Sequence, residues 1–384
     1  MPGHGHTPTH EAWMRLALRL AARAGGQTSP NPMVGAVLVR QGRIIGQGWH
    51  RRAGGPHAEI EALRSAMARG ESLRGATLYV TLEPCCTHGR TPPCTKAILS
   101  SGVRRVVVAA TDPNPNHAGR GFRILRRAGV NLVTGILATE ATRLNEAFNH
   151  WIIHHTPYVL VKAAMTLDGK IATTSGESKW ISGPAARAAG MRLRKCADAI
   201  LVGVNTVRAD DPQLTVRTLR GKTNPKASLR RIVLDSRART PLTARLVNDG
   251  GAALTTIVTS RQAPRRRVDA LSRRVTVWQA PVRKGKINLR WVLRRLGAEN
   301  VTRLLVEGGG EVNAAFLLEG LAHQIAFFFA PKIVGGRDAP RAVSGAGAGS
   351  LADIVELNRV EWRRVGPDLM LQALVEPRRQ RRKR

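Results

Sequence analysis

The sequence predicts an α/β protein of two domains. The chain has 384 residues, more than one ordinary domain needs. In both halves, short runs of aliphatic and β-branched residues alternate with amphipathic segments, a pattern typical of a sheet covered by helices on both faces. Thr156-Pro157 separates the halves. We therefore predict a disordered segment at 1–9, domains over 10–150 and 157–376, and a basic tail at 377–384.

In the first half, a helix and a β-hairpin come before the alternating elements. Helices are expected over residues 10–24, 58–63, 95–100, 122–128 and 139–155. Strands are expected over 36–39, 44–49, 77–82, 106–109 and 130–133. In the second half, strands are expected over 158–163, 199–203, 231–236 and 304–306, and helices after 178–182 and over 312–318. The basic segment 261–286 lacks clear periodicity and is interpreted as a surface loop or edge strand.

Four residues of the first half form a metal-site pattern. His57 and Glu59 lie at the start of one expected helix, and Cys85 and Cys94 lie in the segment that leads into the next expected helix. One imidazole and two thiolates leave a fourth position for water, as in a catalytic zinc site. His-x-Glu followed by Pro-Cys and a second Cys is the signature of zinc-dependent nucleobase deaminases, in which the Glu transfers protons.

The spacing between the cysteines departs from that signature. Eight residues separate Cys85 from Cys94, whereas the usual spacing is two. Each residue alone would be read as structural, for instance a buried Cys that acts as a small hydrophobic residue. The combination favours the metal site, because His57 and Cys94 both lie near expected helix N-termini, where the dipole favours thiolate and hydroxide.

Composition limits the partners and the compartment. Lys and Arg number 61 against 26 Asp and Glu, a formal net charge of +35. The cations are spread along the chain and only 4% of residues are aromatic, so we expect a solvated basic surface and no dedicated nucleic-acid site. Three of the four cysteines lie in one ten-residue stretch, which is no disulfide framework. With no signal peptide and no long apolar run, we expect a cytoplasmic protein without membrane contact.

Longer motifs in the first half give a more specific resemblance. They are Pro30-Asn31-Pro32-Met33-Val34-Gly35, Gly54-Gly55-Pro56-His57-Ala58-Glu59 and the stretch from Thr81 to Cys94. These resemble the deaminase half of the bifunctional riboflavin-biosynthesis deaminase/reductase family, in which the long insert between the cysteines is usual. The resemblance implies a cytidine-deaminase-like three-layer α/β/α domain.

The second half lacks a Gly-x-Gly-x-x-Gly motif, so a standard dinucleotide-binding fold is not expected there. It contains Met165-Thr166-Leu167-Asp168-Gly169-Lys170, Ser178-Lys179-Trp180 and Glu307-Gly308-Gly309-Gly310. A Gly-rich turn between a strand and a helix can cradle phosphates, although structural turns of this kind are as common. As a set, these segments resemble the reductase half of the same family, which implies an α/β domain like dihydrofolate reductase that uses NADPH.

The resemblance implies a role for each matched position. Glu59 is the implied proton carrier, and the implied zinc ligands are His57, Cys85 and Cys94. The deaminase substrate would contact Asn31, His50, His88 and Arg90. NADPH would contact Ala164, Trp180, Thr206, Asp210, Ser236, Gly309 and Gly310. The phosphorylated reductase substrate would contact Ser178, Arg194, Leu214, Arg217 and Glu307. Turn hydrogen bonding, solvated arginines and a core role for Trp180 remain alternatives for individual members.

The implied activity is two consecutive steps of riboflavin biosynthesis. The first removes the 2-amino group of 2,5-diamino-6-(5-phosphoribosylamino)pyrimidin-4(3H)-one, and the second reduces the ribosyl group to a ribityl chain, giving 5-amino-6-(5-phosphoribitylamino)uracil. The expected partners are this small phosphorylated pyrimidine and further copies of the chain in a homo-oligomer. Two alternatives remain: a deaminase of tRNA or free nucleobases, and a basic nucleic-acid-binding protein built on degenerate enzyme domains.

Overall fold

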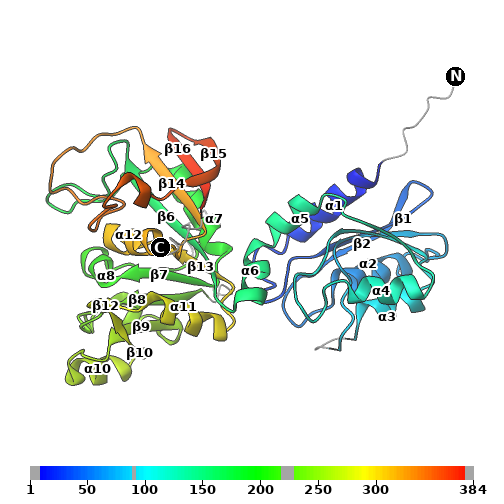
Figure 1. Cartoon of the computed structure of the whole chain (residues 1–384), viewed down its shortest axis with the longest axis horizontal. Helices are drawn as coiled ribbons and strands as arrows, with labels where there is room; N and C mark the ends of the chain where they lie inside the picture. Colours follow the sequence, from blue (N-terminus) through cyan, green and yellow to red (C-terminus); the bar gives the residue numbers. More distant parts are fainter. Residues whose placement is uncertain (1–8, 89–91, 218–228, 377–384) are drawn as a thin grey trace, which may run out of the picture. The chain divides into compact units, whose positions relative to one another are not determined.

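A computed structural model describes residues 9–88, 92–217 and 229–376 (Figure 1). The expected disordered N-terminus (apart from Thr9), the basic tail and Arg90 lie outside these residues. The chain divides into two compact units between His155 and Thr156. Each unit is described by itself.

The first unit is built on a five-stranded mixed sheet in the order β2-β1-β3-β4-β5. The strands are β1 (Gly35–Arg40), β2 (Arg43–Trp49), β3 (Thr77–Leu82), β4 (Arg105–Ala110) and β5 (Asn131–Thr134). β1 runs antiparallel to β2 and β3, whereas β3, β4 and β5 are parallel. β3 is therefore the central strand of the sheet, and Cys85 lies in the segment that follows its carboxyl end.

Helices cover both faces of this sheet, as the sequence predicts. α1 (His10–Ala22) and α5 (Ala138–Leu144) pack with one face of the strands around Met14, Val37 and Val107. The other face carries three helices, α2 (Ala58–Met67), α3 (Cys94–Ser100) and α4 (Arg120–Arg127). This three-layer packing buries apolar surface on both sides of the sheet.

Glycines of β2 set how closely α2 approaches the sheet. A Cβ added at Gly46 would collide with the Ala62 carbonyl of α2, and one at Gly48 with the Glu61 side chain. Larger residues at either strand position would push the helix away. Because His57 and Glu59 sit at the start of α2, this close packing also fixes their position against the sheet.

The expected single helix over 139–155 is wrong in one respect. The structure has two helices, α5 and α6 (Glu146–His154), which meet at Asn145. The Asn145 side chain accepts a hydrogen bond from the Met33 backbone N–H at 2.8 Å and donates one to the Met33 carbonyl at 2.9 Å. These two bonds hold a buried amide against another segment, and apolar periodicity does not register such a contact.

The second unit contains a nine-stranded sheet in the order β10-β9-β8-β7-β13-β6-β14-β16-β15. Its strands are β6 (Tyr158–Thr166), β7 (Ala199–Gly203), β8 (Arg230–Leu234), β9 (Thr255–Ser260), β10 (Thr276–Ala280), β13 (Arg303–Val306), β14 (Gln324–Ala330), β15 (Leu357–Val365) and β16 (Asp368–Val375). All neighbours are parallel except β16, which runs antiparallel to β14 and β15. A small hairpin, β11 (Val282–Arg283) and β12 (Lys286–Ile287), is separate.

Among the described residues of this unit, two helices cover one face of the sheet and four cover the other. α11 (Leu289–Ala298) and α12 (Gly310–Leu318) share one core cluster with the strands. The opposite face packs with α7 (Pro184–Lys195), α8 (Val204–Asp210), α9 (Arg245–Asn248) and α10 (Arg265–Ser272). Single 3₁₀ turns occur at Ala252–Leu254 and Leu351–Asp353. None of the helices in the described ranges combines the length and apolar character that a membrane span requires.

One expectation for the second unit is confirmed and another is confirmed in part. The helix expected after 178–182 is α7, which begins at Pro184 after its N-cap Gly183, and proline suits the first turn. In the segment 261–286 the expected edge strand is present as β10, but the segment also contains α10 and the β11 strand. Its Arg-rich helix buries only Val268 and Leu271, too few apolar positions to show a clear period.

Candidate zinc and reductase sites

Three separate segments bring the predicted metal ligands together in the first unit. His57 is the N-cap residue of α2, Cys94 is the first residue of α3, and Cys85 follows β3. Their ligand atoms all lie within 4.8 Å of one another. His57 Nδ1 is 3.2 Å from Cys94 Sγ and 3.5 Å from Cys85 Sγ.

These distances fit a tetrahedral zinc ion. Zinc binds imidazole nitrogen at about 2.0–2.1 Å and thiolate sulfur at about 2.3 Å, so a tetrahedral N-to-S edge is about 3.6 Å. The two N-to-S distances in the structure are close to that edge. Three protein ligands leave one tetrahedral position for water or substrate, which is the arrangement of a catalytic zinc site.

The pKa shifts of the Cys85 and Cys94 thiols also favour a bound cation at this site. A hydrogen bond from Cys94 lowers the pKa of Cys85 to about 4, and sharing that bond raises the pKa of the Cys94 thiol. The protein alone therefore stabilises one negative sulfur at this position. A bound dication would allow both sulfurs to ionise, because its charge offsets their repulsion.

Glu59 lies beside the three ligands on the first turn of α2. Its side chain is 3% exposed, and burial together with the Cys85 charge raises its pKa to about 7. A carboxyl group with a pKa near neutrality can both accept and donate a proton under physiological conditions. In the zinc-free site Glu59 therefore titrates near neutrality, and the positive charge of a bound zinc ion would lower its pKa from there.

Asn31 and His50 form a fixed polar pair next to the cluster. His50 is buried, donates from Nδ1 to the Pro56 carbonyl at 3.0 Å, and accepts from the Asn31 amide at Nε2 over 3.1 Å. Burial lowers the pKa of His50, which favours this neutral form. Its ring stands edge-on to that of His57, with centroids 5.3 Å apart. His88, expected beside them, is exposed.

Glu83 is a structural residue of this site that sequence reasoning missed. Its buried carboxylate accepts hydrogen bonds from the backbone N–H groups of Asp112, Gly119 and Gly121, at 3.2, 2.9 and 2.9 Å. The three bonds anchor the 112–121 loop next to the segment of Cys85. A lone acidic residue before Pro-Cys gave no signal of this role, because its partners are distant backbone groups.

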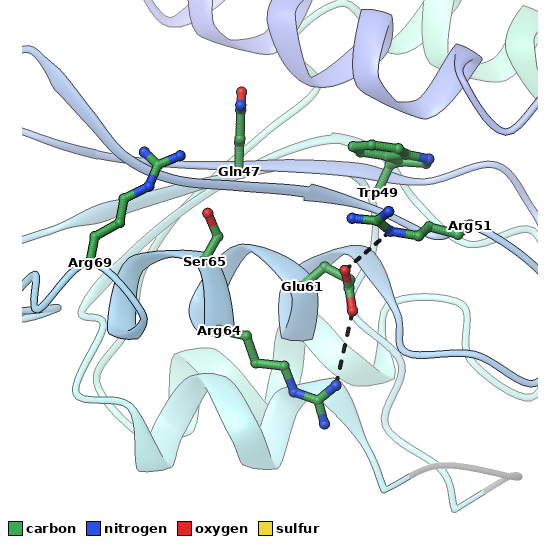
Figure 2. Close-up of a pocket in the computed structure, with 7 residues that line it drawn as sticks. All are labelled: Gln47, Trp49, Arg51, Glu61, Arg64, Ser65 and Arg69. Carbon is green, nitrogen blue, oxygen red and sulfur yellow. Dashed lines mark ion pairs between the residues drawn. The ribbon is translucent and has the colours of Figure 1, made fainter.

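A cavity of about 400 Å³ lies where α2 runs along the edge strand β2 (Figure 2). It is lined by Gln47, Trp49, Arg51, Glu61, Arg64, Ser65 and Arg69. Arg51 lies over the Trp49 ring at 4.4 Å and pairs with Glu61 at 3.3 Å, while Arg64 is 3.9 Å from Glu61. None of the zinc-ligand side chains lines it.

In the second unit, Glu307 and Arg194 form a nearly buried ion pair at the end of β13. Arg194 donates from Nε and one terminal nitrogen to both Glu307 oxygens, at 2.8 and 2.9 Å. Lys162 on β6, which the sequence did not single out, lies 3.5 Å from the same carboxylate. Burial alone would raise the pKa of Glu307, but these two cations bring it down to about 2. Glu307 is therefore an anion throughout the physiological range.

The Gly308-Gly309-Gly310 turn leaves room for a ligand at one point. A Cβ at Gly310 would collide with the Arg341 carbonyl and the Ser344 hydroxyl, so this glycine is needed for packing. A Cβ at Gly309 would meet only Thr206 Oγ1, at 3.9 Å. Gly309 is the N-cap of the nine-residue α12, and such an opening at a helix start suits a phosphate group. The turn therefore has space beside Gly309 for an anionic group such as a phosphate.

Other predicted reductase positions lie on β6, on α8 and in loops around this sheet. Ser178 donates to Asp210 at the end of α8 over 3.3 Å. Trp180 is 65% exposed, with the Arg187 guanidinium 4.5 Å from its ring centroid. The remaining predicted positions are Ala164 on β6, Ser236 just after β8, and Leu214 and Arg217 in the segment after α8.

Comparisons with known proteins define the class of each half. Residues 7–110 match the cytidine and deoxycytidylate deaminase zinc-binding region, and residues 157–371 match the RibD C-terminal domain. The protein is thus a bifunctional enzyme, with a cytidine-deaminase-like zinc-binding domain followed by a reductase domain of the dihydrofolate reductase type.

Curated relatives match nearly the whole chain. Riboflavin biosynthesis protein RibD of Actinobacillus pleuropneumoniae is 42% identical over 96% of both chains, and that of Escherichia coli is 41% identical over 94% of this chain and 98% of the relative. The solved structure of Acinetobacter baumannii RibD superposes with a TM-score of 0.84 at 36% identity, covering 96% of this chain and 99% of that one. The chain belongs to the RibD family of riboflavin biosynthesis. This membership decides against the two alternative functions, a deaminase of tRNA or free nucleobases and a nucleic-acid-binding protein on degenerate enzyme domains.

Proposed function

We propose that the chain deaminates 2,5-diamino-6-(5-phosphoribosylamino)pyrimidin-4(3H)-one and then reduces the product to 5-amino-6-(5-phosphoribitylamino)uracil. The observation that carries this proposal is the cluster of His57, Cys85 and Cys94 beside a buried Glu59, in a chain that also has the reductase domain. A solved relative of Thermotoga maritima, 34% identical with a TM-score of 0.82, is described as a diaminohydroxyphosphoribosylaminopyrimidine deaminase/5-amino-6-(5-phosphoribosylamino)uracil reductase. We assign deamination to residues 10–150 and reduction to 157–376.

In the deaminase domain, His57, Cys85 and Cys94 would hold one zinc ion, which supplies a Lewis acid that activates water at neutral pH. Glu59 would carry the two protons of the attacking water in turn, the first to the ring nitrogen and the second to the departing amine. Asn31 and His50 line the pyrimidine pocket, where their mutual hydrogen bond fixes the orientation of the Asn31 amide. His88 and Arg90 contact the phosphoribosyl group, for which a guanidinium is a suitable partner.

In the reductase domain, NADPH would supply the hydride for the ribosyl carbon. Thr206, Gly309 and Gly310 hold its phosphates at the start of α12, and Ala164, Trp180, Asp210 and Ser236 complete the cofactor contacts. The sugar phosphate binds Ser178, Leu214 and Arg217. Glu307 and Arg194 face the substrate as a neutralised pair, because each carries the counter-charge of the other.

We further propose a homo-oligomer that works in the cytoplasm. The edge strand β15 and the neighbouring β16 expose Val360, Trp362 and Leu369, at 48%, 57% and 43%. An exposed apolar sheet edge is usually covered in the working protein. A second copy of the chain could cover it.

A coupled assay tests the proposed function. Zinc-loaded protein is mixed with the diaminopyrimidine phosphate and NADPH, and ammonia and NADPH absorbance are followed together. We expect ammonia release followed by NADPH oxidation. Ammonia without oxidation would contradict the reductase half of the proposal, and neither signal would contradict both halves.

A further inference from the structure

Arg231 on β8 is a fully buried arginine that the proposed reaction does not use. Its side chain is 2% exposed, and a guanidinium in that position is costly unless its donors are satisfied. Nε donates to Thr255 Oγ1 at 2.8 Å. One terminal nitrogen donates to the Gln213 carbonyl at 3.1 Å and to Asp249 at 2.7 Å. The other donates to the Leu246 carbonyl at 3.0 Å and to Asp249 at 2.8 Å.

All five guanidinium N–H groups of Arg231 are therefore used. A buried group that is fully satisfied is rigid, because every displacement breaks a charge-assisted hydrogen bond. Its acceptors come from the segment after α8, the end of α9 and the start of β9. Arg231 thus fixes the position of the Gln213 carbonyl relative to strands β8 and β9 and to helix α9.

The Gln213 side chain transmits this anchoring to Arg217. Gln213 Oε1 accepts a hydrogen bond from the Arg217 guanidinium at 2.9 Å. A second arginine holds the same short segment, because Arg194 donates to the Thr215 carbonyl at 3.2 Å while it binds Glu307. Leu214, between these two points, is buried with a positive φ of 51°, so the backbone has little freedom there.

We propose that Gln213 is a positioning residue that aims Arg217 at the phosphate group of the reductase substrate, and that Arg231 holds Gln213 in place. This inference rests on the proposed function, which assigns Arg217 to the substrate phosphate. Neither Gln213 nor Arg231 touches the substrate. Their effect is to restrict an exposed, flexible arginine to an orientation in which it can bind phosphate bidentately, which lowers the entropy lost on binding.

Steady-state kinetics of the reductase step test the proposal with zinc-loaded full-length protein. Gln213→Ala removes the acceptor for Arg217 without touching the buried network, and we expect about a 10-fold higher KM for the phosphorylated substrate, from the loss of one hydrogen bond to a charged group. KM for NADPH and kcat should stay within about twofold of wild type. The same substrate without its phosphate should give equal KM values for variant and wild type.

Two changes test the anchoring by Arg231. Arg231→Lys loses the fork of donors, and Asp249→Asn keeps the shape but weakens the bidentate bond, so the second variant decides if the first fails to fold. Both should raise KM for the phosphorylated substrate selectively. Arg245→Gln is the matched control. Arg245 forms an exposed ion pair with Asp211, which lies two residues before Gln213, and it takes no part in the Arg231 network. This variant should leave KM unchanged.

Arg217→Ala separates the inference from the proposed function. If it raises KM for the phosphorylated substrate and Gln213→Ala does not, the positioning role of Gln213 is overturned and the phosphate role of Arg217 stands. If it leaves KM unchanged, the phosphate assignment of Arg217 is wrong and the inference falls with it. An equal loss for the phosphorylated and dephosphorylated substrates would also overturn the inference.

Discussion

Two glutamates, one in each unit, occupy similarly sheltered positions and have opposite pKa shifts. Burial and the Cys85 charge raise the pKa of Glu59 to about 7. Glu307 is also desolvated, yet Arg194 and Lys162 lower its pKa to about 2. Burial alone therefore does not decide the state of a carboxyl group, and the nearest charges do.

The difference suits two different chemical roles. In the zinc-free site Glu59 can gain and lose a proton at neutral pH, which suits its proposed role as a proton carrier. Glu307 holds its charge and organises two cations, one of which also binds the Thr215 carbonyl. The deaminase unit thus has a titratable carboxyl group among its proposed metal ligands, whereas the reductase unit has a permanent anion paired with two cations.

The largest effect that we expect comes from removing Glu59, the proposed proton carrier. Glu59→Gln keeps the size of the side chain and should lower deamination by about 10²–10⁴-fold, the usual contribution of a general acid–base group. Zinc content, measured by metal analysis, should equal that of wild type, because Glu59 is not a ligand. Substantial ammonia release by the zinc-loaded variant would remove Glu59 from its role.

The second effect concerns the permanent anion. Glu307→Gln leaves Arg194 and Lys162 without their shared counter-charge, and breaking such a sheltered pair costs about 3–5 kcal/mol of unfolding free energy. Glu11→Gln is the control, because Glu11 pairs with Arg15 and both side chains are more than half exposed, a setting in which a pair contributes about 0–1 kcal/mol. Equal losses in denaturant unfolding of the two variants would contradict the account.

A pH series sharpens the same comparison. The pKa of Glu307 lies near 2 in the folded protein and near 4.5 ordinarily, so its ionised form stabilises the fold above about pH 4.5. That contribution, about 3 kcal/mol, should be lost as pH falls from about 4.5 to 2. The stability difference between wild type and Glu307→Gln should therefore shrink in acid. A difference that stays constant over this range would be the contrary result.

Glu59 should show the opposite pH dependence in zinc-free protein. Its folded pKa lies above its ordinary value, so its contribution is complete below about pH 4.5 and is lost as pH rises through about 7. Zinc-free Glu59→Gln should therefore be about 1–3 kcal/mol more stable than zinc-free wild type at pH 8 and equal to it at pH 4. Thermal unfolding at both values measures this, and no gain at pH 8 would argue against a raised pKa.

The sequence pattern joins the residues of the proposed deaminase centre more directly than those of the reductase centre, for a physical reason. His57 and Glu59 lie at the start of α2, Cys85 lies after β3, Cys94 begins α3, and these residue types are rare together at such short spacings. Glu307 and Arg194 are 113 positions apart, and Lys162 is an unremarkable lysine in a strand. Without the family resemblance, nothing in the local pattern joins these three.

The sequence analysis missed two structural features that each depend on one buried polar side chain, Asn145 and Glu83. The break at Asn145 follows from two hydrogen bonds to Met33, 112 positions away. The role of Glu83 depends on three backbone N–H groups in a later loop. Apolar periodicity predicts strands, helices and the faces that they bury, but it carries no information on which distant backbone group a polar side chain will bind.

Separate assays of the two steps with the two glutamate variants test the central claim most directly. Each variant is given the diaminopyrimidine phosphate for ammonia release and, separately, the deaminated product with NADPH for reduction. Glu59→Gln should lose ammonia release and keep reduction, while Glu307→Gln should keep ammonia release and lose reduction. If folded Glu59→Gln lost both steps, or Glu307→Gln reduced substrate at the wild-type rate, the assignment of one role to each glutamate would be wrong.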